Sequence, residues 1–128
     1  MSIVERRSSP DREDPVDAVS GELTSREHVA ELQRYFDGVV GMAIASVLRA
    51  VEEEKGPTGM TPEWLQDKIG GPVTDFFLER ALEEQKRTQH LHMDFAALVV
   101  TLETIIDHLM RTHNDVKQAL GAVGIQAA

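Results

Sequence analysis

Apolar residues recur at spacings of three and four along residues 29–51, which is the period of one face of an α-helix. The pattern predicts a helix over residues 25–54. Thr24 and Glu27 match a capping box at its start, in which each side chain accepts a hydrogen bond from the backbone N–H of the other residue. The Gly-Pro pair at 56–57 is expected to end the helix, because proline cannot continue it.

A second, shorter helix is predicted over residues 62–69. Thr61 is placed to cap it, and Pro62 suits the first helical position, where no backbone N–H is needed. The Gly-Gly pair at 70–71 is expected to end this helix, since glycine in a helix interior costs about 1 kcal/mol relative to alanine. Trp64, the single tryptophan of the chain, is expected to pack this turn against the longer helices.

Residues 73–120 contain neither proline nor glycine and are rich in helix-forming side chains. They predict one continuous helix, about 70 Å long at 1.5 Å per residue. Its middle, residues 83–90, carries no large apolar side chain and is either an exposed helical neck or a hinge. A continuous helix is favoured, because Glu83 and Arg87 stand four residues apart in the stabilising order.

Within this segment, apolar side chains alternate at spacings of four and three over more than four heptads, as in a coiled coil. Val99, Ile106 and Leu120 widen the apolar stripe, so it must be covered by the first helix, by further copies of the chain, or by both. The predicted fold is therefore all-α, a helical hairpin whose long C-terminal helix forms an oligomeric helical bundle or coiled coil. The seam positions are Leu91, Phe95, Leu98, Leu102, Ile105, Leu109, Thr112, Val116, Ala119 and Val123.

Residues 39–48 are apolar or small on every side of the first predicted helix, which a surface helix of a monomer does not require. Gly41, four residues before Ala45, is the expected point of closest approach to another element. Ten residues are too few to span a bilayer. The segment is therefore enclosed by its own bundle, by another subunit or by an apolar ligand, and the sequence leaves these three open.

The remaining N-terminal part, residues 1–23, has many charged and serine residues and only scattered apolar ones. Such a stretch buries too little surface to offset its ordering entropy. It is predicted to be a disordered tail, either a plain solvated extension or an arm that orders on a partner. Residues 24–128 are expected to form a single helical domain.

Charge and cysteine content narrow the classes of partner. The 128 residues include 13 Lys and Arg against 22 Asp and Glu, a net charge of -9, and no cysteine. An acidic chain without a clustered basic face is not expected to bind nucleic acid. The lack of cysteine excludes disulfides and thiolate metal sites. With no transmembrane or signal-like apolar segment evident, the chain is expected to be soluble and cytoplasmic.

Histidine and carboxylate side chains gather in the C-terminal part, so metal binding has to be considered. The composition resembles that of hemerythrin-like and ferritin-like bundles, but no Glu-x-x-His motif occurs in the chain. His92 and His113 fall beside the predicted seam, where burial would lower the pKa of each imidazole. The residues concerned are His90, His92, Asp94, Glu103, Asp107, His108, His113 and Asp115.

No catalytic, cofactor or metal site is predicted, because the phosphate-binding and nucleophile-elbow motifs are missing. The favoured function is a non-catalytic assembly or accessory subunit that forms a homo-oligomer, a tetramer or a dimer, and scaffolds a larger protein complex. The alternatives are a bundle that binds a lipid or quinone, and a metal-binding bundle. The predicted interface residues are Val39, Gly41, Ala45, Leu48, Leu91, Phe95, Leu98, Leu102, Ile105, Leu109 and Val116.

Overall fold

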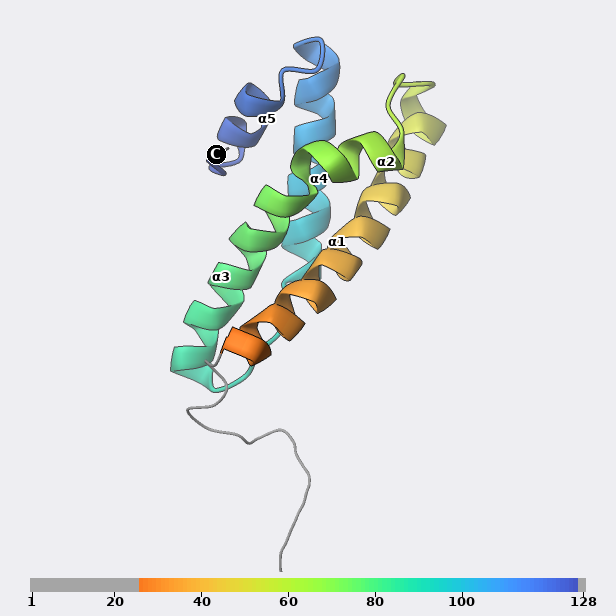
Figure 1. Ribbon diagram of the computed structural model, residues 1–128. Coiled ribbons are helices and arrows are strands. Elements are labelled where there is room, and N and C mark those ends of the chain that lie inside the picture. Colours follow the sequence, from red (N-terminus) through yellow and green to blue (C-terminus); the bar gives the residue numbers. More distant parts are fainter. Residues whose placement is uncertain (1–25, 127–128) are drawn as a thin grey trace, which may run out of the picture. The chain divides into compact units, whose positions relative to one another are not determined.

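The computed structural model describes residues 26–126, and these are helices joined by short loops, with no strand among them (Figure 1). The prediction of an all-α fold is confirmed. The chain divides into two compact units, residues 1–34 and residues 35–128. Of the first unit, residues 26–34 are described, and they form the opening turns of a helix. The predicted tail over residues 1–23 lies outside the described residues.

Helix α1 runs from Arg26 to Lys55, one residue away from the predicted range at each end. After it, Gly56 and Gly59 turn the chain with φ of 91° and 81°, values that favour glycine. The Glu52 carboxylate accepts hydrogen bonds from the backbone and the hydroxyl of Thr58, at 3.0 and 2.8 Å. These bonds favour the charged form and lower the pKa of Glu52.

The next helical segment is longer than predicted. Helix α2 (Pro62–Leu65) begins after Thr61, whose hydroxyl accepts a hydrogen bond from the backbone of Trp64, and leads into a π-helical turn, η2 (Gln66–Gly70). Helix α3 (Gly71–Thr88) follows directly.

The expectation that the glycine pair ends this helix is wrong, since Gly70 and Gly71 both keep right-handed helical dihedral angles. Pro72 cannot donate a hydrogen bond to the turn before it, and the wider π turn accommodates the proline without ending the helix. Leu65 is the fully buried side chain of α2, while Trp64 is half-buried.

The continuous helix expected over residues 73–120 is also wrong, because the chain breaks twice and forms three helices there. At the first break, Gln89 adopts a left-handed conformation with φ of 62° and donates its backbone N–H to the carbonyl of Gln85. Residues 89–94 then form a loop. Helix α4 (Phe95–Arg111) starts after Asp94, whose carboxylate accepts a hydrogen bond from the backbone of Ala97 at 3.1 Å.

The second break lies between α4 and a short helix, α5 (Val116–Ala122). His113 and Asn114 have φ of 57° and 69°, and left-handed residues cannot continue a right-handed helix. Asp115 then caps α5 by accepting a hydrogen bond from the backbone of Gln118 at 3.1 Å. The two aspartates that follow the breaks are therefore N-cap residues, which are typical of helix starts.

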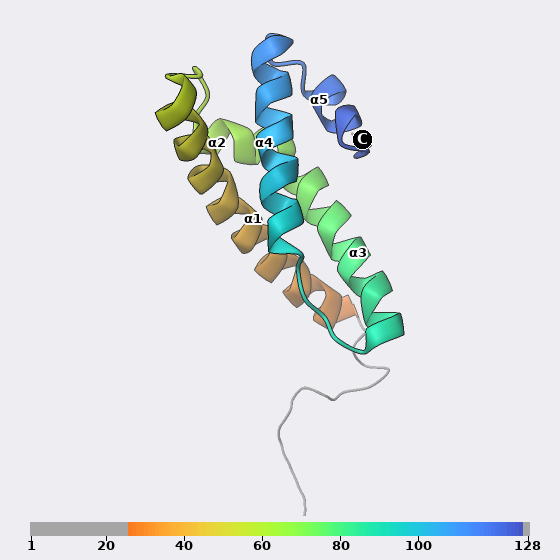
Figure 2. The same ribbon diagram turned by 180° about the vertical axis from the view of Figure 1, so that it is seen from behind.

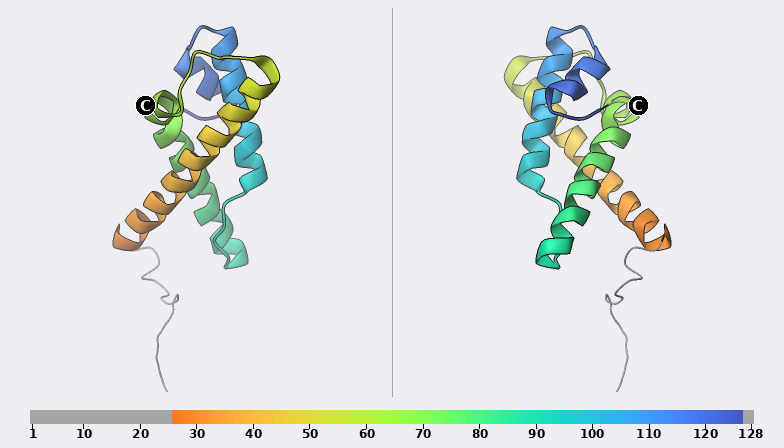
Figure 3. Two further views of the ribbon diagram at one scale, coloured as in Figure 1. Left: turned by 90° about the vertical axis from the view of Figure 1, so that its right-hand side faces the viewer. Right: turned by 90° about the vertical axis from the view of Figure 1, so that its left-hand side faces the viewer.

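These breaks fold the second unit onto itself. The loop after α3 brings α4 back, so that it lies in front of α3 and of the part of α1 that begins at Tyr35 in the view of Figure 2. Helix α5 turns back against α4 and η2 (Figure 3). Every helix of the unit contributes to one core. Its fully buried large side chains are Phe36, Val40, Ile44, Leu65, Ile69, Val73, Leu98, Leu102, Ile105, Ile106, Leu109 and Leu120.

Candidate interaction surface

The histidines and carboxylates expected to compete for a metal are spread over separate elements. His90, His92 and Asp94 belong to the loop before α4, while His113 and Asp115 lie in the turn before α5. Within residues 26–126, no three histidine or carboxylate side chains converge on a possible metal position. His92 and His113 are both exposed, so the burial expected beside a seam is absent and that expectation is wrong.

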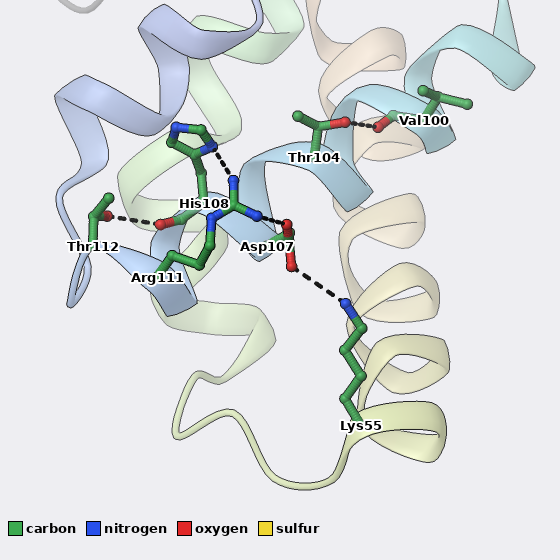
Figure 4. A network of polar contacts seen from close by, with 7 residues as sticks. All are labelled: Lys55, Val100, Thr104, Asp107, His108, Arg111 and Thr112. Atoms are coloured by element: carbon green, nitrogen blue, oxygen red, sulfur yellow. Dashed lines mark hydrogen bonds and ion pairs between the residues drawn. The ribbon is translucent and has the colours of Figure 1, made fainter.

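One polar network joins α1 to α4 (Figure 4). The Asp107 carboxylate accepts a hydrogen bond from Lys55 Nζ at 3.3 Å and forms an ion pair with Arg111. Arg111 Nη2 also lies 2.9 Å from His108 Nδ1. The hydrogen bond from Lys55 is the main cause that lowers the pKa of Asp107, and the charge of Arg111 acts in the same direction.

This network has no means to activate a nucleophile. A carboxylate with a lowered pKa, held by two cations, is a weak general base. The Thr112 hydroxyl donates to the backbone carbonyl of His108, and the Thr104 hydroxyl donates to that of Val100 (Figure 4). The contacts therefore connect the end of α1 to α4, and exposed ion pairs of this kind contribute at most about 1 kcal/mol to stability.

Three surface pockets of the second unit have mixed or charged linings. A pocket of about 260 Å³ lies where α3 meets the loop before α4, with Arg80, Glu84, His92 and Asp94 around Phe77 and Ala81. Another, of about 520 Å³, lies between the start of α3 and residues 124–126 and includes two carboxylates. A third, also about 520 Å³, is lined by charged α3 side chains. Lipid and quinone sites are predominantly apolar, and these three pockets do not match that requirement.

Gly41 is a point of close approach, and its neighbour belongs to the same chain. A Cβ atom at Gly41 would lie 2.6 Å from Gln66 Oε1, and one at Gly70 would lie 3.1 Å from Gln66 Nε2. The Gln66 amide thus occupies space that two glycines leave, one on α1 and one at the end of the π turn. Within the described chain, Gly41 therefore serves the contact between α1 and η2.

The predicted interface residues separate into three groups by exposure. Leu91, Val39, Gly41 and Val116 are half-buried, and Phe95 and Ala45 are exposed, Phe95 by 55%. The other five are buried by the chain's own helices, so in this structure a second copy cannot reach them. They are Leu48, Leu98, Leu102, Ile105 and Leu109.

The wide apolar stripe, which predicted a bundle of more than two helices, is thus divided. Its central part on α4 packs into the core of one chain, while its two ends lie in the loop before α4 and on α5. Phe95, at the start of α4, lies on the surface because the preceding loop redirects the backbone there.

Helix α1 has a side that no described part of the second unit covers, which we call the outer α1 face. Tyr35 and Met42 stand on it two helical turns apart, and 66% and 71% of their surfaces are exposed. Residues spaced by three, four and seven share one side of a helix. The outer α1 face comprises the exposed residues Tyr35, Gly38, Met42, Ala45, Ser46 and Arg49.

This face carries no charge between its two ends. Residues 38–48 are all uncharged, in a chain of which 27% of the residues are charged. Gly38 stands in this run although no atom of residues 26–126 lies within 4 Å of the place where its Cβ would be. Packing within these residues therefore gives no reason for a glycine that weakens the helix by about 1 kcal/mol.

Tyr35 and Met42 are absent from the predicted interface residues. The sequence shows residues 39–48 as apolar on all sides and so gives no means to tell the covered side from the open one. The spacing of seven between them does not separate them from Val40 and Val47, which have the same spacing and face the core.

Comparison with known protein families, with curated proteins and with solved structures finds no match to this chain. None of the helices in residues 26–126 is both long enough and apolar enough to cross a membrane.

Proposed function

We propose that this chain is a non-catalytic helical subunit that associates with a second copy of itself through the outer α1 face. One observation carries the proposal: two large apolar side chains, Tyr35 and Met42, are more than half exposed on a helix side without a charge from residue 38 to residue 48. Exposed apolar surface that is contiguous is typical of a protein contact, whereas isolated exposed apolar residues are ordinary.

The charge of the chain supports a contact at this place. Two copies that each carry a net charge of -9 repel one another at most orientations. Contact is favourable where apolar area is removed from water without bringing carboxylates together. The outer α1 face meets both conditions over about three helical turns.

A dimer fits this arrangement better than a tetramer. The wide apolar stripe on residues 91–123 favoured a coiled coil of more than two helices. Its central side chains, Leu98, Leu102 and Ile105, instead fill the core of a single chain. The outer α1 face of one chain is then left for the same face of a second copy, which is a pairing of two. A further role as an accessory subunit of a larger complex stays a prediction.

A matched pair of substitutions tests the proposal. Met42→Glu places a charge in the middle of the outer α1 face, while Val100→Glu places one on α4 at a similarly exposed position, 60% against 71%. A buried charge without a partner is strongly unfavourable. We expect light scattering to give a dimer for the unchanged protein and for Val100→Glu, and a monomer with unchanged helicity for Met42→Glu.

Two results would overturn the proposal. One is a monomeric unchanged protein at micromolar concentration. The other is a Met42→Glu protein that keeps the mass of the unchanged one, because the contact would then lie elsewhere.

A further inference from the structure

We infer that the two copies pair α1 against α1 in antiparallel orientation, with the two-fold axis at Met42, so that Arg49 of each copy stacks on the Tyr35 ring of the other. This inference rests on the proposed function and specifies its geometry. The pairing brings together the aromatic end and the cationic end of the outer α1 face.

The spacing along the helix supports this axis. Tyr35 lies seven residues before Met42, and Arg49 lies seven residues after it. A two-fold axis at Met42 in an antiparallel pair therefore sets Tyr35 of one copy level with Arg49 of the other, twice. Met42 then meets Met42 at the centre, where a flexible thioether side chain adapts readily to its neighbour.

Charge distinguishes the antiparallel pair from the parallel one. In a parallel pair, Arg49 would face Arg49 and two guanidinium groups would repel. In the antiparallel pair, each guanidinium meets a tyrosine ring, and arginine stacks well on aromatic faces. Both groups are free to stack across the contact. Arg49 forms no ion pair within residues 26–126. Tyr35 contacts the Phe36 ring edge-on at 6.0 Å.

The residues between these ends permit a close contact. Gly38, Ala45 and Ser46 are small and exposed, and no atom of residues 26–126 lies within 4 Å of the missing Cβ of Gly38. Small residues let two helix backbones approach closely, which lets side chains as long as tyrosine and arginine reach across. Gly38, which meets no neighbour within residues 26–126, gains a role in the pair.

Disulfide trapping tests the orientation, and the chain contains no cysteine that could interfere. Gly38→Cys and Ser46→Cys are both at exposed positions on the outer α1 face. In the antiparallel pair, residue 38 of one copy is level with residue 46 of the other copy. Residue 38 of one copy and residue 38 of the other are separated by eight positions, or about 12 Å along the helix. A disulfide requires Cα atoms about 4.4–6.8 Å apart, so two Gly38→Cys chains cannot form one with each other.

The proteins are purified separately, mixed in equal amounts and oxidised. We expect a cross-linked heterodimer of the Gly38→Cys and Ser46→Cys chains, and little dimer from either variant alone. Met42→Cys alone reports on association in either orientation and should cross-link. Glu103→Cys, an exposed position on α4, serves as the control and should form no cross-link.

Failure of the geometry and failure of the proposed function give different results. Cross-linking of Gly38→Cys with itself would show a parallel pair and overturn the inference while the self-association stands. A dimeric mass without any cross-link at residues 38, 42 or 46 would place the contact off this face and overturn both the geometry and the surface. A monomeric mass for all variants and for the unchanged protein would overturn the self-association itself.

Discussion

Replacing Gly41 by alanine probes the contact between α1 and the π turn. Gly41 lies inside α1, and the added Cβ would stand 2.6 Å from Gln66 Oε1, closer than non-bonded atoms approach. The obstructing atom is the end of the half-buried Gln66 side chain, which must move to admit the methyl group. The natural comparison is Gly38→Ala on the same helix, where the new methyl group meets no atom within 4 Å.

The expected free energies of unfolding follow from these two environments. At both positions, alanine favours the helix over glycine by about 1 kcal/mol. Gly38→Ala should keep this gain. Gly41→Ala must also displace the end of the flexible Gln66 side chain, which places its cost near the lower end of the about 1–3 kcal/mol for overpacking and its net change near zero. Gly38→Ala should therefore exceed Gly41→Ala in stability by about 1 kcal/mol.

Urea unfolding followed by circular dichroism measures both variants. The series is repeated at a tenfold different protein concentration, because association adds to apparent stability. Adding Gln66→Ala to Gly41→Ala removes the obstructing amide, and the resulting double-mutant cycle should show a coupling of at least about 0.5 kcal/mol. Equal gains for Gly38→Ala and Gly41→Ala, with no coupling to Gln66, would refute the reasoning.

Three further predictions concern the core, the polar network and the first chain break. Leu102→Ala should lower the free energy of unfolding by about 2–5 kcal/mol, against under about 0.5 kcal/mol for the exposed Val100→Ala, in the same urea assay. Asp107→Asn should cost less than about 1 kcal/mol at pH 7. Since the pKa of Asp107 is lowered from 3.8 by folding, this cost should vanish as acid titration passes below the folded pKa. Gln89→Gly should raise the melting temperature, with a gain of about 1 kcal/mol, because glycine favours a φ of 62°.

Local sequence signals predicted some helix boundaries well and others badly. The bounds of α1 followed from an apolar period that persists to a Gly-Pro stop, and α2 starts at Pro62, as its Thr61 cap and its proline indicated. The second break after residue 88 was hidden, because the seven-residue apolar repeat keeps its register across it. The first break follows residues 83–90, which the sequence left as a neck or a hinge, and neither break contains glycine or proline. Asp94 and Asp115, each before an apolar run, were the available capping signals.

The candidate surface needed tertiary structure for a different reason. A segment that is apolar on every side does not show which side its own bundle covers, and the packing of the folded unit decides this by burying Val40, Ile44 and their neighbours. Likewise, the need for glycine at residue 41 depends on Gln66, which is brought to it by the π turn. Neither contact has a local pattern in the sequence.

The mass of the unchanged chain in solution tests the central claim most directly. Sedimentation equilibrium at micromolar concentration should give twice the 14.2 kDa of one chain, with dissociation on dilution. A single species of 14.2 kDa across that range would contradict self-association through the outer α1 face.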